Sequence, residues 1–520
     1  MFSSTWVRLL VFLLAIGLAA AAVSCNPKPD GNEDGAAHRN TVPSPAVKQL
    51  NPDGLFIAYT YETNGKMETC GCSSKQLGGL ARRGTLIDQY RDGYDRHLLL
   101  LDGGKIVPDN SEFSRFKSDI ILRMMNKMGY SAMHIGFYEF NFEMPELAKW
   151  ADNASFPLMN SNVLYTGDFP NLIREKPLAD IGSTNITAEL EATDFYRMVT
   201  GKEAATKYMW SASPVVFVTK GNIRIGILSA TEPEWIEGLG WKYLTPLPIR
   251  DTFKHLLARF HDKADLWVAM VEANNITVEQ LMKSLPEIKI WLSGNPRKGE
   301  SMITHSKTDA GQYWQNIFME GKYLGITSVD KKAGEFFISQ EEIGIEDTIA
   351  QRNDLQLIMV NEYRPKLEQI FKNQTQPIGR EFVPATSCNK CHPEEFEAWR
   401  ASKHHEALPT LIGKKQNWNP DCVSCHVEYD SVNEAQLTLQ CTMCHYNSWE
   451  KHIDEAEAGG AVTPLGETID KQYCTKCHDP ENSNKFDSDY RHYFETIKHW
   501  DGPTVPGEAQ VTGGSTKGEH

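Results

Sequence analysis

Four copies of the motif Cys-x-x-Cys-His lie in the last quarter of this chain, beginning at Cys388, Cys422, Cys441 and Cys474. In such a motif the two thiols can form thioether bonds to one porphyrin, and the following histidine is held where its imidazole can ligate the iron. A Cys-x-x-Cys pair is also half of a zinc site, but zinc binding gives no reason for a histidine directly after every pair. The motifs therefore predict four covalently attached c-type haems.

The motifs also name the residues that would hold these haems. The predicted attachment sites are the eight motif cysteines: Cys388, Cys391, Cys422, Cys425, Cys441, Cys444, Cys474 and Cys477. The predicted proximal iron ligands are the four motif histidines: His392, His426, His445 and His478. The other three of the eleven cysteines are Cys25, Cys70 and Cys72, so none are left for a long-range disulfide framework.

The N-terminus has the pattern of an export signal. Arg8 precedes an apolar run from Leu9 to Ala22, which suits a secretory signal over residues 1–24 better than a spanning helix of about 20 residues. The small residues before Cys25 resemble a bacterial lipobox, which implies lipid attachment at Cys25; an ordinary signal peptide is the alternative. Residues 25–53 are rich in proline, glycine and acidic side chains and predict a flexible tether. We therefore expect an extracytoplasmic, membrane-anchored bacterial lipoprotein, in the periplasm or on the outer-membrane surface.

The net charge of −15, which haem propionates would make more negative, restricts the partners of this chain. Strong negative charge disfavours nucleic acid and anionic lipid surfaces. We expect redox partner proteins with a cationic docking surface, and contact with the membrane through the lipid anchor only.

Beyond the tether the sequence divides into two large units. Residues 54–345 alternate short apolar strands with amphipathic helices, and the charged, amphipathic residues 346–378 predict a linking helix. Residues 379–505 contain the four motifs, and residues 506–520 are expected to form a disordered tail. The strand candidates of the first unit begin at Leu55, His97, Ser131, Pro214, Ile223, Asp265 and Ile288, and the helix candidates at Leu80, Phe116 and Thr252. This alternation predicts a layered α/β fold.

Local sequence in the first unit points to a family. The segments GGLARRGTLI, LLLDGG, MNKMGYSAMHIG, FPLMNSNV and WLSG, which begin at Gly78, Leu99, Met125, Phe156 and Trp291, resemble the N-terminal domain of UshA-type 5'-nucleotidases. These enzymes are a branch of the calcineurin-like metallophosphoesterases. The resemblance implies a β sandwich flanked by helices, with a two-metal site at the strand ends.

The metal ligands that this resemblance implies have all been replaced. Glu62 and Asn64 stand where the family has Asp and His, and Lys105 stands in place of the carboxylate that bridges both metals. The family's Gly-Asn-His-Glu is Gly136, Phe137, Tyr138 and Glu139 here, a ligand histidine is Glu272, and Gly-His-x-His is Gly294, Asn295, Pro296 and Arg297. Two-metal hydrolysis needs a bridging carboxylate and neutral imidazoles. We therefore expect this site to have lost phosphoesterase activity; an active phosphoesterase with other ligands is the alternative.

Cys70, Gly71 and Cys72 form a short motif after the first former ligand. A small disulfide or two buried thiols is the simplest interpretation of such a pair. Nearby positive charge from Lys105 and Arg297 would lower a thiol pKa and favour the reactive thiolate. The stretch also resembles UshA-like proteins that carry selenocysteine in this motif, which implies redox or sulfur chemistry. Cys70 and Cys72 are therefore our candidate catalytic thiols.

The second unit, together with the segments between its motifs, resembles the tetrahaem cytochromes of ammonia oxidisers and the multihaem hydroxylamine oxidoreductases. This resemblance implies a mainly helical or irregular multihaem fold, with His404, His452 and His499 as distal iron ligands. It leaves one haem, that of His426, either five-coordinate or bound by His405 or His492.

Three functions are consistent with the sequence. The leading hypothesis is an electron-transfer lipoprotein whose first unit is a docking or redox-sensing head. The second is an oxidoreductase that acts on a small sulfur or nitrogen compound at Cys70 and Cys72 or at an open haem. The third is an active 5'-nucleotidase-like metallophosphoesterase.

Overall fold

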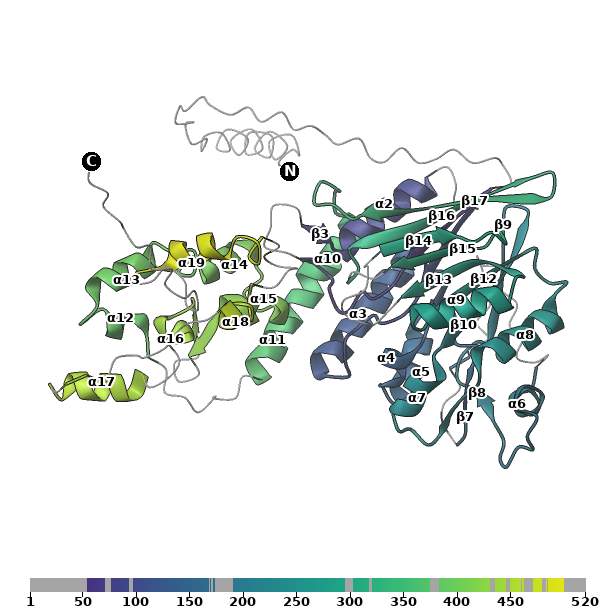
Figure 1. Ribbon diagram of the computed structural model, residues 1–520, viewed down its shortest axis with the longest axis horizontal. Coiled ribbons are helices and arrows are strands. Elements are labelled where there is room, and N and C mark those ends of the chain that lie inside the picture. Colours follow the sequence, from purple (N-terminus) through teal and green to yellow (C-terminus); the bar gives the residue numbers. More distant parts are fainter. Residues whose placement is uncertain are drawn as a thin grey trace, which may run out of the picture. The chain divides into compact units, whose positions relative to one another are not determined.

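The computed structural model describes most of the chain from residue 54 to residue 499 (Figure 1). The described residues are 54–70, 76–92, 97–167, 169, 172–173, 190–294, 303–317, 320–374, 383–430, 435–445, 449–459, 461–462, 471–478, 483 and 485–499. The predicted signal, tether and tail, with Cys25, Cys72 and Arg297, lie outside them. Below, residues 54–374 are called the head and residues 383–499 the C-terminal part; both belong to one compact unit, Val47–His520.

The first large sheet of the head has the strand order β17-β16-β1-β4-β5-β6. These strands are β1 (Leu55–Thr60), β4 (Leu98–Asp102), β5 (Ala132–His134), β6 (Leu158–Met159), β16 (Tyr323–Lys332) and β17 (Glu335–Gly344). Strands β1, β4, β5 and β6 run parallel, and every residue of β1 and β4 is buried. Burial on both faces explains why these strands are continuous apolar runs.

The second large sheet has the order β14-β15-β13-β12-β10-β9. Its strands are β9 (Val215–Lys220), β10 (Ile223–Thr231), β12 (Leu266–Glu272), β13 (Ile288–Gly294), β14 (Ile303–Lys307) and β15 (Tyr313–Ile317). Smaller sheets are formed by β7 (Val163–Tyr165), β8 (Met209–Trp210) and β11 (Leu244–Pro246), and by β2 (Thr69–Cys70) and β3 (Leu77–Gly78). All seven predicted strands are confirmed.

Helices cover the outer faces of the two sheets. They are α2 (Leu80–Arg91), α3 (Glu112–Met128), α4 (Phe137–Phe140), α5 (Met144–Asn153), α6 (Ala192–Thr200), α7 (Pro233–Gly238), α8 (Ile249–Phe260), α9 (Asn275–Ser284), α10 (Asn353–Ile358), the π-helix Met359–Tyr363 and α11 (Arg364–Gln374). Buried side chains of both sheets, such as Ile57, Leu99 and Val268, form one cluster between them. Two further clusters join each sheet to its helices. The head is therefore a mixed α/β sandwich, and the predicted layered fold is confirmed.

The predicted linking helix differs from the structure in two respects. It begins at Asn353, not at residue 346. Ile345 and Glu346 are held in β pairing instead, because the Ile345 amide donates to the Lys322 carbonyl (2.9 Å) and Glu346 forms a bridge with Leu77. Residues 347–349 then turn, and the Ile349 amide donates to the Glu346 carbonyl (3.1 Å). The helix also belongs to the head, since Leu355 is buried in the same core cluster as the first sheet.

The C-terminal part is mainly helical, with little apolar core. Its helices are α12 (Ala385–Cys388), α13 (Pro393–Arg400), α14 (Ala407–Lys414), α15 (Pro420–His426), α16 (Cys441–Cys444), α17 (Trp449–Glu457), α18 (Lys471–Cys474) and α19 (Tyr490–Ile497), beside the hairpin of β18 (Glu428–Asp430) and β19 (Ala435–Leu437). Among its described residues, the buried hydrophobic ones are Ala385, Ala407, Leu408, Leu411, Val423, Phe486 and Phe494. So small a core is typical of chains that rely on prosthetic groups or metals for stability.

Within the described parts of the chain, none of the helices is long and apolar enough to cross a bilayer.

Candidate functional site

The former ligand positions of the head meet at the carboxyl ends of its parallel strands, where open α/β sheets commonly bind ligands. The loop after β1 pairs with the loop after β4: the Glu62 amide donates to the Gly104 carbonyl (3.0 Å), and the Asn64 amide donates to the Lys105 carbonyl (3.0 Å). The resemblance to the nucleotidases therefore located a real convergence of loops.

Lys105 forms a buried ion pair with Glu62 at this convergence. The two residues are 7% and 3% exposed. The Lys105 ammonium also lies 4.5 Å from the centre of the Tyr138 ring. Burial raises the pKa of Glu62 to about 7, although the Lys105 charge acts in the opposite direction. Burial alone would lower the pKa of Lys105, but Glu62 holds it above its ordinary value. Where the nucleotidases would have two metal-binding carboxylates, this chain has a carboxylate neutralised by an ammonium.

The backbone of the same loops is strained. Glu62, Asn64, Lys105 and Glu320 have φ values of 55°, 52°, 54° and 48°, in the left-handed region that side chains other than glycine rarely adopt. Asn64 Nδ2 also donates to Glu320 Oε1 (2.8 Å). Such strain costs about 1–3 kcal/mol per residue and gathers at functional sites. These loops therefore hold a strained backbone at the strand ends.

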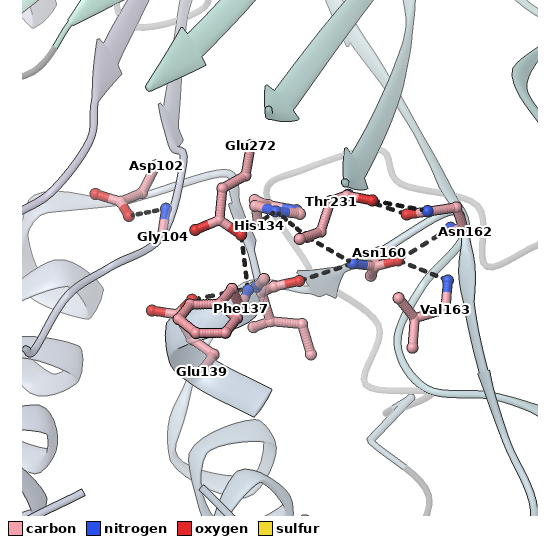
Figure 2. A network of polar contacts seen from close by, with 12 residues as sticks. Asp102, Gly104, His134, Phe137, Glu139, Asn160, Asn162, Val163, Thr231 and Glu272 are labelled. Carbon is pink, nitrogen blue, oxygen red and sulfur yellow. Dashed lines mark hydrogen bonds and ion pairs between the residues drawn. The ribbon is translucent and has the colours of Figure 1, made fainter. Parts of the chain in front are cut away.

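Three further acids, Asp102, Glu139 and Glu272, are buried at or just after the strand ends (Figure 2). Glu139 accepts hydrogen bonds from the amides of Gly136 (3.1 Å) and Ile106 (3.2 Å). Glu272 accepts one from the Phe137 amide (2.7 Å). Burial raises the pKa of Glu139 to about 8, that of Glu272 to about 7 and that of Asp102 to about 6.

His134 is the buried imidazole of this network (Figure 2). Its Nε2 lies 3.1 Å from Thr231 Oγ1 and 4.0 Å from a Glu272 oxygen. Burial lowers the pKa of His134 to about 3, so the ring is neutral. Asn162 donates to the Thr231 carbonyl and to Asn160 Oδ1, each at 2.9 Å, and so fixes the neighbouring strand ends. The network therefore links both large sheets.

The buried acids predict a loss of stability as the pH rises. Between the unfolded pKa of a glutamic acid, about 4.3, and the raised folded values, the folded protein retains protons that the unfolded chain has released. The free energy of unfolding must therefore fall through this range. Between about pH 5.5 and 8 we expect a fall of at least about 1.4 kcal/mol, the equivalent of one pKa unit, in urea unfolding followed by circular dichroism. Glu139→Gln should weaken this dependence, whereas Glu143→Gln, at an exposed position, should preserve it; stability that rises with pH would contradict the prediction.

The residues at this site do not fit a two-metal centre. Where the resemblance implies a bridging carboxylate and an imidazole, this chain has the ammonium of Lys105 and the amide of Asn64. Within the described ranges, no three His, Cys, Asp or Glu side chains are arranged to hold one metal ion. Asn295, Pro296 and Arg297 lie outside those ranges. Two-metal hydrolysis depends on a water activated by bound metal ions, and these side chains are not suited to hold those ions.

Three motif histidines of the C-terminal part each face one histidine from outside the motifs. The ring centres of His392 and His452 are 6.0 Å apart. Those of His404 and His478 are 6.1 Å apart, as are those of His445 and His499. The three partners are the residues predicted as distal ligands.

Hydrogen bonds orient several of these rings through Nδ1. His426 Nδ1 lies 3.2 Å from the Ala407 carbonyl, and His499 Nδ1 lies 2.9 Å from the Ile497 carbonyl. An Nδ1–H that donates to a carbonyl leaves Nε2 unprotonated and available to a metal. This arrangement suits iron ligands.

One cavity of about 1640 Å³ joins the four motifs. It is lined by all eight motif cysteines, all four motif histidines and the three predicted distal ligands: Cys388, Cys391, Cys422, Cys425, Cys441, Cys444, Cys474, Cys477, His392, His426, His445, His478, His404, His452 and His499. A site for a single small molecule has roughly 300–1,000 Å³, so this cavity is large enough for several groups. The residues present fit four covalently attached haems.

The remaining candidates lie differently. Of the described residues, His492 lines the cavity, whereas His405 does not and packs its ring 4.8 Å from that of Trp399. The backbone of Cys70 pairs with Leu77 in the small hairpin. Cys72 lies outside the described residues.

Part of the chain is similar in sequence to known 5'-nucleotidases, although no protein-family model matches it. It is 31% identical over 126 residues to the snake venom 5'-nucleotidase of Gloydius brevicauda. The aligned segment covers 23% of this chain and 21% of that protein. It is 35% identical over 114 residues to the 5'-nucleotidase of Vibrio cholerae, which covers 21% of this chain and 20% of that one. The chain contains a 5'-nucleotidase-like domain. It spans about a fifth of the length of these relatives.

Solved structures that are similar to this chain include the 5'-nucleotidase precursor from Thermus thermophilus. That structure matches with a TM-score of 0.44 and 17% identity, over 61% of this chain and 60% of that one.

Sequence reasoning missed the side chains through which the head contacts the second motif. Asp421, directly before Cys422, forms ion pairs of 3.1 Å with both Lys66 and Lys117 of the head. Charged residues in a helix and a loop are ordinarily solvated, so no local signal marked this cluster.

Proposed function

We propose that this protein is an extracytoplasmic tetrahaem c-type cytochrome that transfers electrons, and that its 5'-nucleotidase-like head has lost two-metal phosphoesterase activity. The observation that supports this best is the one-to-one pairing of motif histidines with outside histidines. A structural zinc site needs about four such side chains on one ion, and within the described residues no three His, Cys, Asp or Glu side chains are arranged to hold one.

The spacing of the pairs is that of two imidazoles on one metal. Two metal–nitrogen bonds of about 2 Å each, together with the half-widths of two rings, put the ring centres about 6 Å apart. The three observed separations are 6.0, 6.1 and 6.1 Å. We assign His452 to the haem of His392, His404 to that of His478, and His499 to that of His445.

The haems would supply one-electron redox chemistry, and the chain would hold them and set their potentials. Two histidine ligands give a lower potential than histidine with methionine. The apolar porphyrins would also replace the core that the C-terminal part lacks. Anionic surface charge and lipid attachment at Cys25 lead us to propose cationic redox partners close to a membrane.

The haem of His426 is the one for which we propose an open or weakly ligated iron. The three predicted distal ligands face the other three motif histidines and are therefore assigned to the other three irons. Of the two further candidates, His492 lines the common cavity and His405 does not. We therefore propose that the iron of His426 is open, and name His492, rather than His405, as the alternative ligand.

The experiment that tests this proposal is electron paramagnetic resonance, with optical titration, on the haem-loaded protein. We expect three low-spin haems and one high-spin haem, because the three facing histidine pairs supply two imidazoles to each of three irons. Nitric oxide should change only the high-spin signal. Four low-spin haems that ignore the ligand would restrict the protein to electron relay, and a purified protein without covalent haem would refute the proposal.

A second candidate function is oxidation or reduction of a small sulfur or nitrogen compound. The position of the C-G-C motif favours it. Thr69, which precedes the motif, and Gln76, which follows it, both line the cavity of the four motifs. Such an enzyme would reduce or oxidise its haems when substrate is added, and Cys70→Ser would abolish the change. Manganese- or zinc-dependent turnover of 5'-AMP would instead favour the third candidate, an active phosphoesterase.

A further inference from the structure

The head forms part of the wall of the haem cavity. Its described residues on that wall include Lys66, Met67, Glu68, Arg82, Tyr363 and Arg364. A prosthetic group in this cavity would therefore be surrounded by side chains of both parts of the chain, and the head would contribute to its electrostatic environment.

The second motif is fixed directly to the head by ion pairs. Lys66 Nζ and Lys117 Nζ each lie 3.1 Å from a different carboxylate oxygen of Asp421. Lys117 is only 5% exposed. Burial alone would raise the pKa of Asp421, but the two ammonium groups hold it below its ordinary value. One carboxylate is thus held by two cations next to Cys422.

Most cations of the head on this wall already have a carboxylate partner. Arg364 Nε donates to Glu68 Oε1 (2.9 Å), and Lys66 is held by Asp421. Arg82 differs from them. Its Nε and Nη1 are buried and have no hydrogen-bond partner. A buried polar group without a partner costs about 1–3 kcal/mol, more when it is charged, and calls for an explanation.

The surroundings of Arg82 increase the demand for an anion. Arg82 lies in the first turn of α2, and that turn contains no acidic residue. The N-cap residue Gly79 has no side chain to cap the helix. The positive end of a helix dipole disfavours a cation there. The exposed Asp347 offsets part of the charge at longer range. An anionic group of the cavity's occupant would satisfy both the guanidinium and the helix end.

We propose that Arg82 binds a carboxylate of a haem in this cavity, so that the head tunes the redox potential of that haem. This inference rests on the proposed function. A guanidinium presents a planar pair of N–H donors that matches a carboxylate, and porphyrin propionates are the carboxylates that a haem brings. Positive charge beside a haem favours its reduced form, and hydrogen bonding around a haem is a known determinant of its potential.

The test is a redox titration of the haem-loaded full chain, with Arg82→Gln and Arg82→Lys. Loss of the positive charge in Arg82→Gln is expected to lower one of the four midpoint potentials and leave three unchanged. Arg82→Lys retains the charge and should keep that potential closer to its original value. Arg250→Gln is the matched control, because Arg250 is exposed on the head and is not among the described residues that line the cavity; it should change none of the four.

A second variant keeps the test decisive if Arg82→Gln does not fold. Asp347→Asn removes the opposing charge from an exposed position and should raise the same midpoint potential. Four haems whose potentials are unchanged in all these variants would overturn the inference and leave the proposed function standing. A protein without haem would overturn both.

The titration is also run with and without inorganic phosphate, because a free oxyanion would suit the same guanidinium. A shift in Arg82→Gln that is independent of phosphate supports a haem carboxylate. A shift that appears only with phosphate would assign Arg82 to a free anion and overturn the inference.

Discussion

Replacement of His404 by alanine is expected to convert one low-spin haem of this protein into a high-spin haem. The His404 ring lies 6.1 Å from that of His478, so its removal would leave the iron with a single imidazole. Electron paramagnetic resonance should show one low-spin signal replaced by a high-spin one. The altered haem should also gain a site for nitric oxide.

The adjacent residue provides a matched control for this prediction. His405 is also a histidine, but its ring packs against that of Trp399. Among the described residues, His404 lines the cavity and His405 does not. His405→Ala should leave every haem signal as it was. If the two variants behaved alike, or if His405→Ala alone changed a signal, the assignment of His404 as a distal ligand would be wrong.

Replacement of Lys105 by methionine is expected to destabilise the head strongly. Removal of one partner from a buried ion pair leaves an uncompensated charge and typically costs about 3–5 kcal/mol. Glu62, which is 3% exposed, would be that charge. We expect a loss of this size at about pH 8 in urea unfolding followed by circular dichroism. At about pH 5.5 the loss should be smaller. Burial already raises the pKa of Glu62 to about 7 against the Lys105 charge, and without that charge the carboxyl takes up a proton more readily.

A double variant separates the ion pair from the packing of the lysine stem. Lys105→Met with Glu62→Gln removes both charges, so it should recover most of the stability lost in Lys105→Met alone. Equal losses in the single and double variants would mean that the ion pair is not the cause. Regained binding of divalent metal in Lys105→Asp, but not in Lys105→Met, would show that a carboxylate at this position, and not merely removal of the ammonium, is what metal binding requires.

The sequence predicted the α/β layers of the head well, because buried parallel strands are continuous apolar runs that local pattern reveals. It failed at residue 346, where the chain is amphipathic enough for a helix but its backbone groups are taken up by β16 and Leu77. Such long-range pairing leaves no mark in a local window. The same holds for the contacts of Asp421 with Lys66 and Lys117, which join distant parts of the chain.

The sequence by itself determined the predicted haem attachment residues and proximal ligands, because thioether attachment needs two cysteines and a histidine within five consecutive residues. It also led us to predict the loss of the nucleotidase ligands, since residue type alone excludes an ammonium as a metal ligand. Only the tertiary structure decided which distant histidine faces which motif histidine, that Glu62 pairs with Lys105, and that Nε and Nη1 of Arg82 are buried without a hydrogen-bond partner. These are properties of side chains brought together by packing of the whole chain, and no short stretch of sequence encodes them.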